Sequence, residues 1–247
     1  TEPGAGSDLG ALTATATPNG DGTYALNGQK IFITWGDHDA TPNIVHMVLA
    51  RLPDAPPGPK GISLFLASKF EVKADGSLGD RNAFRPVGVE HKLGIHASPT
   101  CVMSYEGARA TLVGQPNQGL SHMFVMMNAA RLAVGVEGVG IAEMAYQHAL
   151  AYALERRQGR SIWTGEANAP IFDHPDVRRM LSVMKAKIEA ARAICFSTGV
   201  AADMAKHAAS DEARKTWKGR EDLFTPIAKA WSTDVGCDVA SMGVQIH

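Results

Sequence analysis

The first eight residues, TEPGAGSD, combine hydroxyl side chains with a backbone that is fixed at one point and free at two. Thr1 and Ser7 supply the hydroxyls, Pro3 fixes one backbone angle, and Gly4 and Gly6 leave others free. Such a loop can present amides and hydroxyls to a flat polar ring. On composition alone, however, an ordinary surface turn explains the loop better, so a binding role needs support from other residues.

The nine histidines raise the question of a metal site. No H-x-x-x-H or C-x-x-C spacing occurs, and we therefore expect no metal centre. The three cysteines are odd in number and far apart, which favours free, packed thiols over a disulfide framework. They indicate a reducing compartment, and we expect the protein to be cytoplasmic. The cysteines are Cys101, Cys195 and Cys237.

The charge balance argues against one class of partner. The formal net charge is −1, which gives no electrostatic reason to expect nucleic-acid binding. No run of 18 apolar residues occurs, so we expect no membrane span. The chain begins inside a motif and ends without a helix stop signal, and we expect it to be a piece of a longer protein.

Residues 119–159 contain no proline, and their apolar residues recur at a helical period. A helix of this length would be the spine of a bundle and of an oligomer interface. Gly135, Gly138 and Gly140 lie in its middle, and each costs about 1 kcal/mol relative to alanine. We therefore expect another helix or a ligand to approach closely there. No strand precedes the glycines, so they are not a dinucleotide-binding fingerprint.

The residues before this helix read as about eight short strands separated by turns, which is typical of a barrel or sandwich. Asn27-Gly28 predicts a tight turn between two of them. The expected strands are residues 12–17, 23–26, 29–35, 44–52, 61–66, 84–89, 100–105 and 110–113.

After the long helix, we expect a second helix over residues 175–208, with Pro175 in its first turn. Residues 209–219 are predicted to be a solvated turn, and a third helix should begin near Leu223, because Pro226 is tolerated only near a helix start. The composition changes near residue 116. The sequence thus predicts a β-domain over residues 1–116 and an incomplete helical-bundle domain over residues 117–247.

Seven short sequence motifs occur in the same order as in a known protein family. They are TEPGAGSDL, LNGQKIFIT, KGISLFL, KLGIHASPT, ARLAVG, YALERRQGR and VQIH. With them the chain resembles the acyl-CoA dehydrogenase superfamily over essentially its whole length. The wording of residues 31–66 is most similar to the 3-methylmercaptopropionyl-CoA dehydrogenase-like branch.

The resemblance implies an α+β fold, in which a middle β-barrel domain precedes a C-terminal antiparallel helical bundle. It implies that an N-terminal domain and the end of the bundle are missing. It also implies an FAD-dependent oxidoreductase of fatty acid metabolism that dehydrogenates an acyl-CoA between Cα and Cβ. Electrons would pass to an electron-transfer flavoprotein, and the enzyme would be a homodimer or tetramer.

The resemblance assigns the first loop to the flavin. Thr1, Gly6 and Ser7 would touch the flavin ring, and Ser7 would also touch the substrate thioester. The family's second flavin segment reads Trp-Ile-Thr.

That second segment is Phe32, Ile33 and Thr34 in this chain. The phenylalanine keeps an aromatic wall but lacks the indole N–H. Arg156 matches the family's diphosphate-binding position in a neighbouring subunit, where a guanidinium binds phosphate in a bidentate manner. Gln245 would touch the adenosine part across the same interface.

The resemblance places Arg131 and His96 near the substrate, although loop hydrogen bonding also explains the histidine. Part of the family has its catalytic glutamate just before the arginine, and this chain has Ala130 there. Glu137 and Glu143 are the local substitutes, but both read better as helix-surface carboxylates. We therefore expect no catalytic base in this chain and place it downstream of the last residue. Without the missing domain, we expect weak or no FAD retention.

Two alternatives remain open on the sequence. The same fold serves acyl-CoA oxidases and DNA-alkylation-response-type flavoproteins, although the net charge does not favour the second. A non-catalytic flavin- or CoA-binding module is the other alternative, and a missing glutamate downstream would favour it. The acyl chain is open as well; a short sulfur-containing chain follows from the branch alone.

Overall fold

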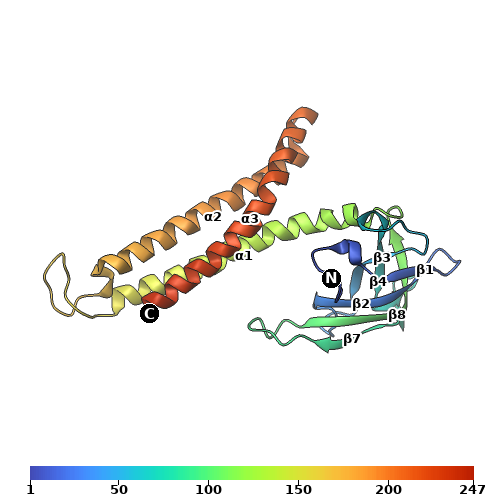
Figure 1. Cartoon of the computed structure of the whole chain (residues 1–247), viewed down its shortest axis with the longest axis horizontal. Helices are drawn as coiled ribbons and strands as arrows, with labels where there is room; N and C mark the ends of the chain where they lie inside the picture. The colour runs from blue at the N-terminus through green and yellow to red at the C-terminus, as the bar shows by residue number, and fades with distance from the viewer. The chain divides into compact units, whose positions relative to one another are not determined.

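The computed structural model describes all residues, 1–247. The chain divides into two compact units, Thr1–Val125 and Met126–His247, which we call the barrel unit and the helical unit and describe separately (Figure 1). In chain order the elements are η1 (Leu9–Ala11), β1 (Thr15–Pro18), β2 (Tyr24–Thr34), β3 (Val45–Arg51), η2 (Pro59–Gly61), β4 (Ile62–Ser68), β5 (Phe70–Val72), β6 (Leu78–Arg81), β7 (Phe84–Val89), β8 (Thr100–Val113), α1 (Gly119–Glu155), η3 (Ile171–Asp173), α2 (Pro175–His207) and α3 (Asp211–Ile246).

The barrel unit closes on itself. Its strands follow the order β2-β1-β3-β4-β8, and β8 pairs again with β2. All these pairs are antiparallel except β1 and β3, which meet in parallel at Thr15 and Arg51. β7 extends the sheet from β8, and β5 and β6 form a separate hairpin. This topology confirms the predicted β-barrel and excludes the sandwich.

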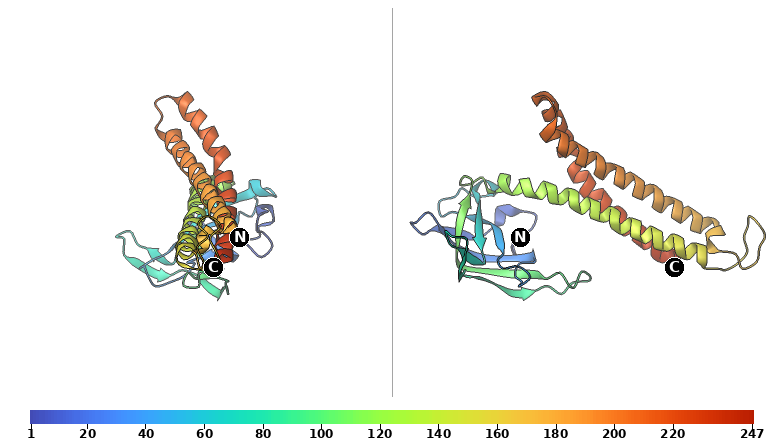
Figure 2. Two further views of the ribbon diagram at one scale, coloured as in Figure 1. Left: turned by 90° about the vertical axis from the view of Figure 1, so that its left-hand side faces the viewer. Right: turned by 180° about the vertical axis from the view of Figure 1, so that it is seen from behind.

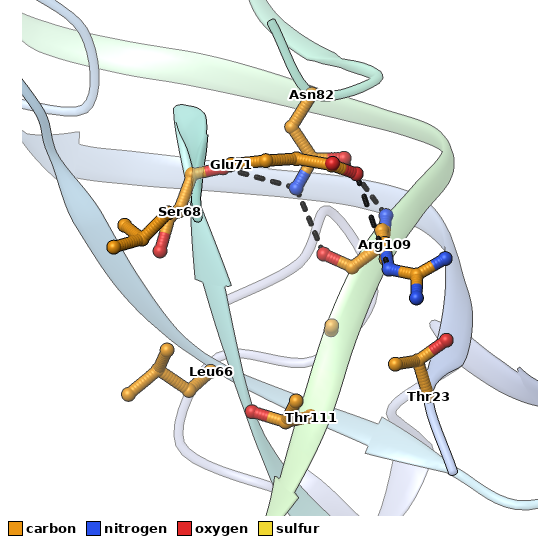
Figure 3. A pocket seen from close by; sticks show the side chains of 9 residues that line it. Thr23, Leu66, Ser68, Glu71, Asn82, Arg109 and Thr111 are labelled. Carbon is orange, nitrogen blue, oxygen red and sulfur yellow. Dashed lines mark hydrogen bonds and ion pairs between the residues drawn. The ribbon is translucent and has the colours of Figure 1, made fainter. Parts of the chain in front are cut away.

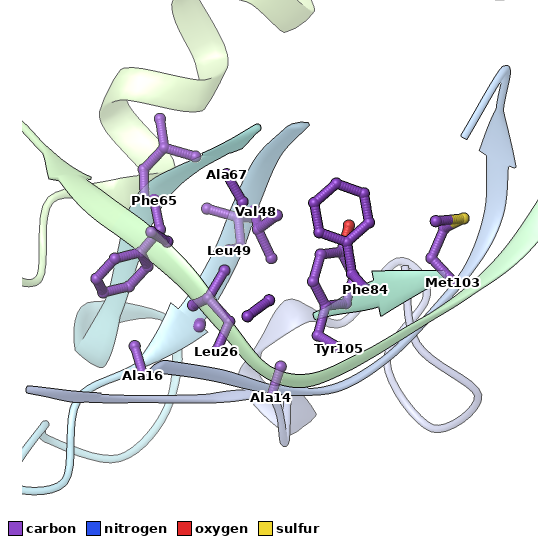
Figure 4. Close-up of a cluster of buried hydrophobic side chains, with 14 of the residues drawn as sticks. Ala14, Ala16, Leu26, Val48, Leu49, Phe65, Ala67, Phe84, Met103 and Tyr105 are labelled. Atoms are coloured by element: carbon purple, nitrogen blue, oxygen red, sulfur yellow. The ribbon is translucent and has the colours of Figure 1, made fainter. Parts of the chain in front are cut away.

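Large and small side chains alternate in the barrel interior (Figure 4). Leu26, Phe65 and Met103 are almost fully buried, and alanines such as Ala16 and Ala67 fill the narrower places. Burial of one large apolar side chain contributes roughly 1.5–3 kcal/mol to folding. The interior is therefore a packed core, as in other small barrels, and functional side chains must lie at its rim or outside.

Two predicted strand breaks are wrong. Asn27-Gly28 is not a turn, because β2 runs straight through it and stays paired with β8. β8 is likewise one strand of 14 residues rather than two. The irregularity is a bulge, at which Gly107 has a φ of 81° and the register shifts between Leu26 and Asn27. A bulge bends a strand without reversing its direction. Residues that resemble a turn in the sequence therefore lie within a continuous strand here. The β5–β6 hairpin was not expected.

The helical unit confirms two predicted helices and corrects the third. α1 and α2 lie where the sequence places them, and Pro175 opens α2. α3, however, begins at Asp211 rather than near Leu223. Ser210 caps it by accepting a hydrogen bond from the amide of Ala213, so the charged residues that follow form helical turns. Pro226 lies inside this helix.

Gly135 and Gly138 of α1 face α3. A Cβ at Gly138 would collide with the carbonyl of Ser232, and one at Gly135 would lie 2.9 Å from the carbonyl oxygen of Ala228. This confirms the expected close approach of a helix at these two positions. Gly140 instead has open space around it within the chain. α2 runs antiparallel to both other helices, because its contacts meet their residues in reverse chain order (Figure 2). Lys185 and Arg192 contact Tyr146 and Glu143 of α1. Lys187 and Cys195 contact Asp238 and Ser232 of α3.

α1 is also long and apolar enough, by length and composition alone, to cross a membrane. Core helices of water-soluble proteins can meet the same test, and Arg131, Glu137 and Glu143 place charges along this one. The absence of a membrane span therefore stays a prediction.

Candidate functional site

The N-terminal loop, residues 1–8, alternates buried anchors with exposed groups. Glu2 and Ala5 are buried and bind each other through two backbone hydrogen bonds of 3.0 Å. Thr1, Gly6 and Ser7, the residues predicted to touch the flavin, are exposed. The amides of Gly6 and Ser7 and the serine hydroxyl have no hydrogen-bond partner within the chain. The loop thus has a fixed inner side and an outer side with free polar groups.

The anchor at Glu2 is a buried ion pair. Lys30 Nζ lies 2.7 Å from Glu2 Oε1 and also donates to the carbonyl oxygen of Leu49 at 2.7 Å. Glu2 further accepts from the amide and hydroxyl of Thr13, each at 2.7 Å, and from the amide of Ala14. Burial alone would raise the pKa of Glu2, but the hydrogen bonds from Lys30 and Thr13 hold it below its usual value. The carboxylate is therefore charged and fully paired.

The pair is not among the predicted site residues, although the sequence carries one signal for it. Leu26 and Lys30 are both buried and four residues apart, so strand alternation puts both on the inward face of β2. A lysine at an inward position needs an anionic partner, since an unpaired buried charge is costly. An acidic residue in a neighbouring loop is the expected partner of this lysine.

The second segment, residues 32–35, has strained backbone conformations. Phe32 has a φ of 59° and Trp35 one of 54°, values that side chains other than glycine rarely adopt. The rings of these two residues are 59% and 45% exposed. Thr34 is exposed, whereas Ile33 packs on the barrel core. The register of β2 against β8 shifts between Lys30 and Ile33, so the conformation of Phe32 belongs to a β-bulge, a feature that is common beside functional sites.

Hydrogen bonds join the second segment to two loops. The amide of Ile31 donates to the carbonyl oxygen of Thr1 at 3.0 Å, which places the N-terminal loop directly beside Phe32. The amide of Trp35 donates to the carbonyl oxygen of Pro99 at 2.8 Å, which places residues 91–99 on the other side. Three chain segments from the predicted site therefore meet at one place on the barrel.

The 91–99 loop carries His96. Its Nε2 donates to the carbonyl of Lys92 at 2.8 Å, and Lys92 Nζ binds the carbonyls of Ile95 and Ser98 at 2.7 and 2.6 Å. The imidazole is thus a loop brace and remains exposed. Leu93 is fully exposed beside it.

A buried histidine supports the turn that follows the second segment. His46 Nε2 lies 2.8 Å from the carbonyl oxygen of Gly36, and Nδ1 lies 2.6 Å from the hydroxyl of Tyr105. Since a carbonyl only accepts, Nε2 carries the proton and Nδ1 accepts from the tyrosine. Burial lowers the pKa of His46 and outweighs the opposing effects of Gly36 and Asp37. The ring is neutral near pH 7.

The helical unit holds the other predicted residues. Arg131 on α1 is half-buried and donates to Asn128 Oδ1 at 3.1 Å. Arg156 follows the last residue of α1, and Gln245 lies in the last turn of α3; both are exposed. Tyr152 stacks on His247 at 4.5 Å between ring centroids, so the ends of these two helices lie together. The binding roles of Arg131, Arg156 and Gln245 stay predictions.

Neither local carboxylate is placed as a base. Glu143 accepts from Arg192 at 2.7 Å and from Gln147 at 3.0 Å, and these bonds hold its pKa below its usual value. Glu137 is exposed on α1. A base for carbon acids needs a raised pKa, and the geometry gives Glu143 the opposite.

A pocket of about 320 Å³ lies elsewhere on the barrel unit, beside the β5–β6 hairpin (Figure 3). Its two charged lining residues, Arg109 and Glu71, lie 3.9 Å apart, and Arg109 also lies 2.8 Å from Asp21 outside the lining. No predicted site residue lines it. The pocket is therefore separate from the three segments described above.

Comparisons with known proteins match both units. The family model for the acyl-CoA dehydrogenase middle domain covers residues 1–108, and that for the C-terminal domain covers residues 117–247. The 3-methylmercaptopropionyl-CoA dehydrogenase of Ruegeria pomeroyi is 51% identical over 248 residues, which are 100% of this chain and 42% of that protein. This likeness confirms the predicted branch.

More distant relatives agree. The caffeyl-CoA reductase-Etf complex subunit CarC of Acetobacterium woodii is 29% identical and is covered to 56%, with 100% of this chain aligned. The solved butyryl-CoA dehydrogenase from Megasphaera elsdenii matches with a TM-score of 0.76 and 30% identity, over 100% of this chain and 56% of that one. The chain spans only about half the length of these proteins. It belongs to the acyl-CoA dehydrogenase family, of which it carries the middle and C-terminal domains.

Proposed function

We propose that the whole protein is an FAD-dependent acyl-CoA dehydrogenase acting on a short-chain thioester, and that residues 1–8 and 32–35 hold the flavin ring. One observation carries this proposal: the two segments that family likeness assigns to the flavin are about 30 residues apart in sequence, yet the backbone bond from Ile31, next to Phe32, to Thr1 places them side by side. Family membership and the named relatives support the reaction class.

The residues present fit a flavin. Gly4 and Gly6 have open space where a side chain would stand, so a flat ring can approach the backbone. The unpaired amides of Gly6 and Ser7 are donors that suit its carbonyl oxygens and ring nitrogens. Phe32 offers an exposed aromatic face, and the exposed hydroxyl of Thr34 lies two residues further on.

The flavin, when bound, supplies the acceptor for the hydride from Cβ. The chain's own residues would bind and orient. Ser7 would donate to the cofactor and the thioester, Arg131 would hold the acyl-CoA, and Arg156 and Gln245 would hold the diphosphate and adenosine of a neighbouring subunit's cofactor. Hydrogen bonds to the thioester carbonyl would make the α-proton more acidic.

The base that removes this proton is proposed to lie outside these 247 residues. Glu143 is ion-paired, and Ala130 has no carboxylate. A base in the family must be a carboxylate whose pKa is raised near the acyl chain, so we place it in the part of the protein that follows His247.

We further propose that an electron-transfer flavoprotein accepts the electrons and that the enzyme works as a homo-oligomer in the cytoplasm. The name of CarC as a subunit of an Etf complex supports the first part. The cross-subunit roles of Arg156 and Gln245 would require the second.

Anaerobic titration of the full-length protein with acyl-CoA thioesters tests the proposal. We expect bound flavin whose absorbance is bleached by saturated short-chain thioesters, with 3-methylmercaptopropionyl-CoA and butyryl-CoA as the first two compared. A yellow protein that no thioester bleaches would indicate a non-catalytic flavin fold. A colourless full-length protein would refute the cofactor assignment.

A further inference from the structure

We propose that Glu2 and Lys30 are positioning residues that hold the two flavin segments in register with each other; the inference rests on the function proposed above. Neither residue is among those assigned to the cofactor or substrate. Both are buried beneath the segments, with exposed fractions of 3% and 5%.

The position of the pair in the chain is the first argument. Glu2 directly follows Thr1, and Lys30 lies two residues before Phe32. The side chains of Glu2 and Lys30 contact each other at 2.7 Å, and the neighbouring residues Thr1 and Ile31 share a backbone hydrogen bond of 3.0 Å. The two segments are therefore joined twice, once through the backbone and once through charged side chains.

The completeness of the hydrogen bonding is the second argument. Each oxygen of Glu2 accepts two hydrogen bonds. Oε2 accepts from the amide and the hydroxyl of Thr13, and Oε1 accepts from the amide of Ala14 and from Lys30 Nζ. The lysine also donates to Leu49 on β3. Glu2 thus connects the loop to the two residues that precede β1 and also to β2. Lys30 connects β2 to β3. The two backbone bonds between Glu2 and Ala5 shape the loop internally, and the bonds of the Glu2 side chain fix where the loop lies on the barrel.

The physics of buried ion pairs is the third argument. Such a pair contributes little net stability compared with apolar side chains of similar size, because desolvation offsets the attraction. What the pair adds is direction, since charge-assisted hydrogen bonds fix both distance and angle. A barrel that needed stability alone could use two apolar side chains here. The pair therefore makes most sense as a device that sets where the loop lies.

The same physics provides the test, because it separates stability from position. Lys30→Met leaves a buried carboxylate unpaired and should lower the melting temperature. The double variant Glu2→Gln, Lys30→Met removes the unpaired charge and should regain most of that loss. The directional bond stays absent in both. Glu2→Gln alone keeps an oxygen acceptor for Thr13 but leaves the Lys30 ammonium with only the carbonyl of Leu49. Flavin release is still measured on the double variant if neither single variant folds.

The matched control is Phe65→Leu. This ring is fully buried in the barrel core and packs edge-on against Tyr24, at the opposite end of β2 from Phe32. Its loss lowers stability without touching either segment. All variants are made in the full-length protein, and flavin release is measured by the recovery of free-flavin fluorescence on dilution, beside hydrogen exchange of residues 1–8.

We expect flavin release at least about tenfold faster in Lys30→Met and in the double variant, with faster exchange of the loop amides. Phe65→Leu should release flavin within about twofold of the unchanged protein at an equal loss of melting temperature. The inference fails if the double variant regains unchanged flavin release together with its stability, or if Phe65→Leu releases flavin equally fast. A full-length protein that binds no flavin at all would overturn the proposed function, and this inference with it.

Discussion

The barrel unit and the helical unit bury different kinds of polar groups. The barrel unit buries two lysines, a glutamate and a histidine, which reach partners far away in sequence: Lys30, Lys69, Glu2 and His46. The helical unit buries only hydroxyl side chains, and Thr198 and Thr225 bind carbonyls of their own helices. Its ion pairs lie nearer the surface. Long-range polar bonds thus shape the barrel rim, whereas close apolar packing shapes the helices.

This difference separates two ways of fixing geometry in the chain. Hydrogen bonds fix angles, and the barrel uses them beneath the loops that the flavin ring is proposed to touch. Close packing fixes the distances between helix axes, and the helical unit uses it to position the side chains on its helices. Six substitutions, in order of expected effect, test the comparison.

The largest effect should come from breaking a buried pair. Lys69 lies 2.6 Å from Asp37, and both side chains are largely buried. Lys69→Met should lower the free energy of unfolding by about 3 kcal/mol, because it leaves a buried carboxylate with Arg81 as its remaining partner. The control in the helical unit is Arg192→Met, which removes a more exposed pair with Glu143 and should cost under about 1 kcal/mol. Urea unfolding measures both, and equal losses would erase the contrast.

The next effect concerns close packing. Gly138→Ala should destabilise the helical unit by roughly 1–3 kcal/mol, since the added methyl collides with the carbonyl of Ser232. Gly140→Ala, two residues further along α1, has open space and should stabilise the chain by up to about 1 kcal/mol through helix propensity. Thermal unfolding of the two variants measures both effects. Destabilisation by both would mean that Gly140 also faces a partner.

A smaller effect is the pH dependence of the barrel unit. The folded-state pKa of His46 is lowered by burial, so the unfolded chain binds more protons below its ordinary value of 6.5. The stability it contributes is present above that pH and is lost as the pH falls through the folded pKa, by at most about 1.4 kcal/mol per pH unit. His46→Gln should flatten the slope of unfolding free energy between pH 7 and pH 5 (about the range in which histidine titrates). An unchanged slope would assign it to other groups.

The smallest effect should be a gain. Phe32 has a left-handed conformation that costs an ordinary side chain roughly 1–2 kcal/mol, and its ring is mostly exposed. Phe32→Asn should therefore raise stability by under about 1 kcal/mol, since asparagine tolerates this conformation. The same change should weaken flavin binding in the full-length protein. A loss of stability would show that packing, rather than function, keeps the phenylalanine there.

Periodic and capped elements could be predicted from the sequence. The apolar repeat of α1 and Pro175 at the start of α2 gave both helices, and the family words gave the barrel and its place before the bundle. The close approach at Gly135 and Gly138 also followed, because glycine in a helix interior needs a reason.

Elements whose form depends on distant partners could not be predicted. Asn27-Gly28 has the composition of a turn, but pairing with β8 along its whole length keeps β2 extended. The charged start of α3 reads as a loop until the cap at Ser210 is considered. The Glu2–Lys30 pair joins residues 28 apart, and local pattern alone does not connect them. The strain at Phe32 is a backbone property that no residue type announces.

The most direct test of the account is hydrogen exchange on the full-length protein with its flavin bound and after the flavin is removed. We predict that the flavin protects the amides of residues 1–8 and 32–36. Residues 110–112 on β8, which lie beside Tyr24 at the opposite end of β2 from Phe32, should exchange equally in both states. Protection confined to other parts of the chain, with residues 1–8 and 32–36 unchanged, would contradict the assignment of the flavin to this rim of the barrel.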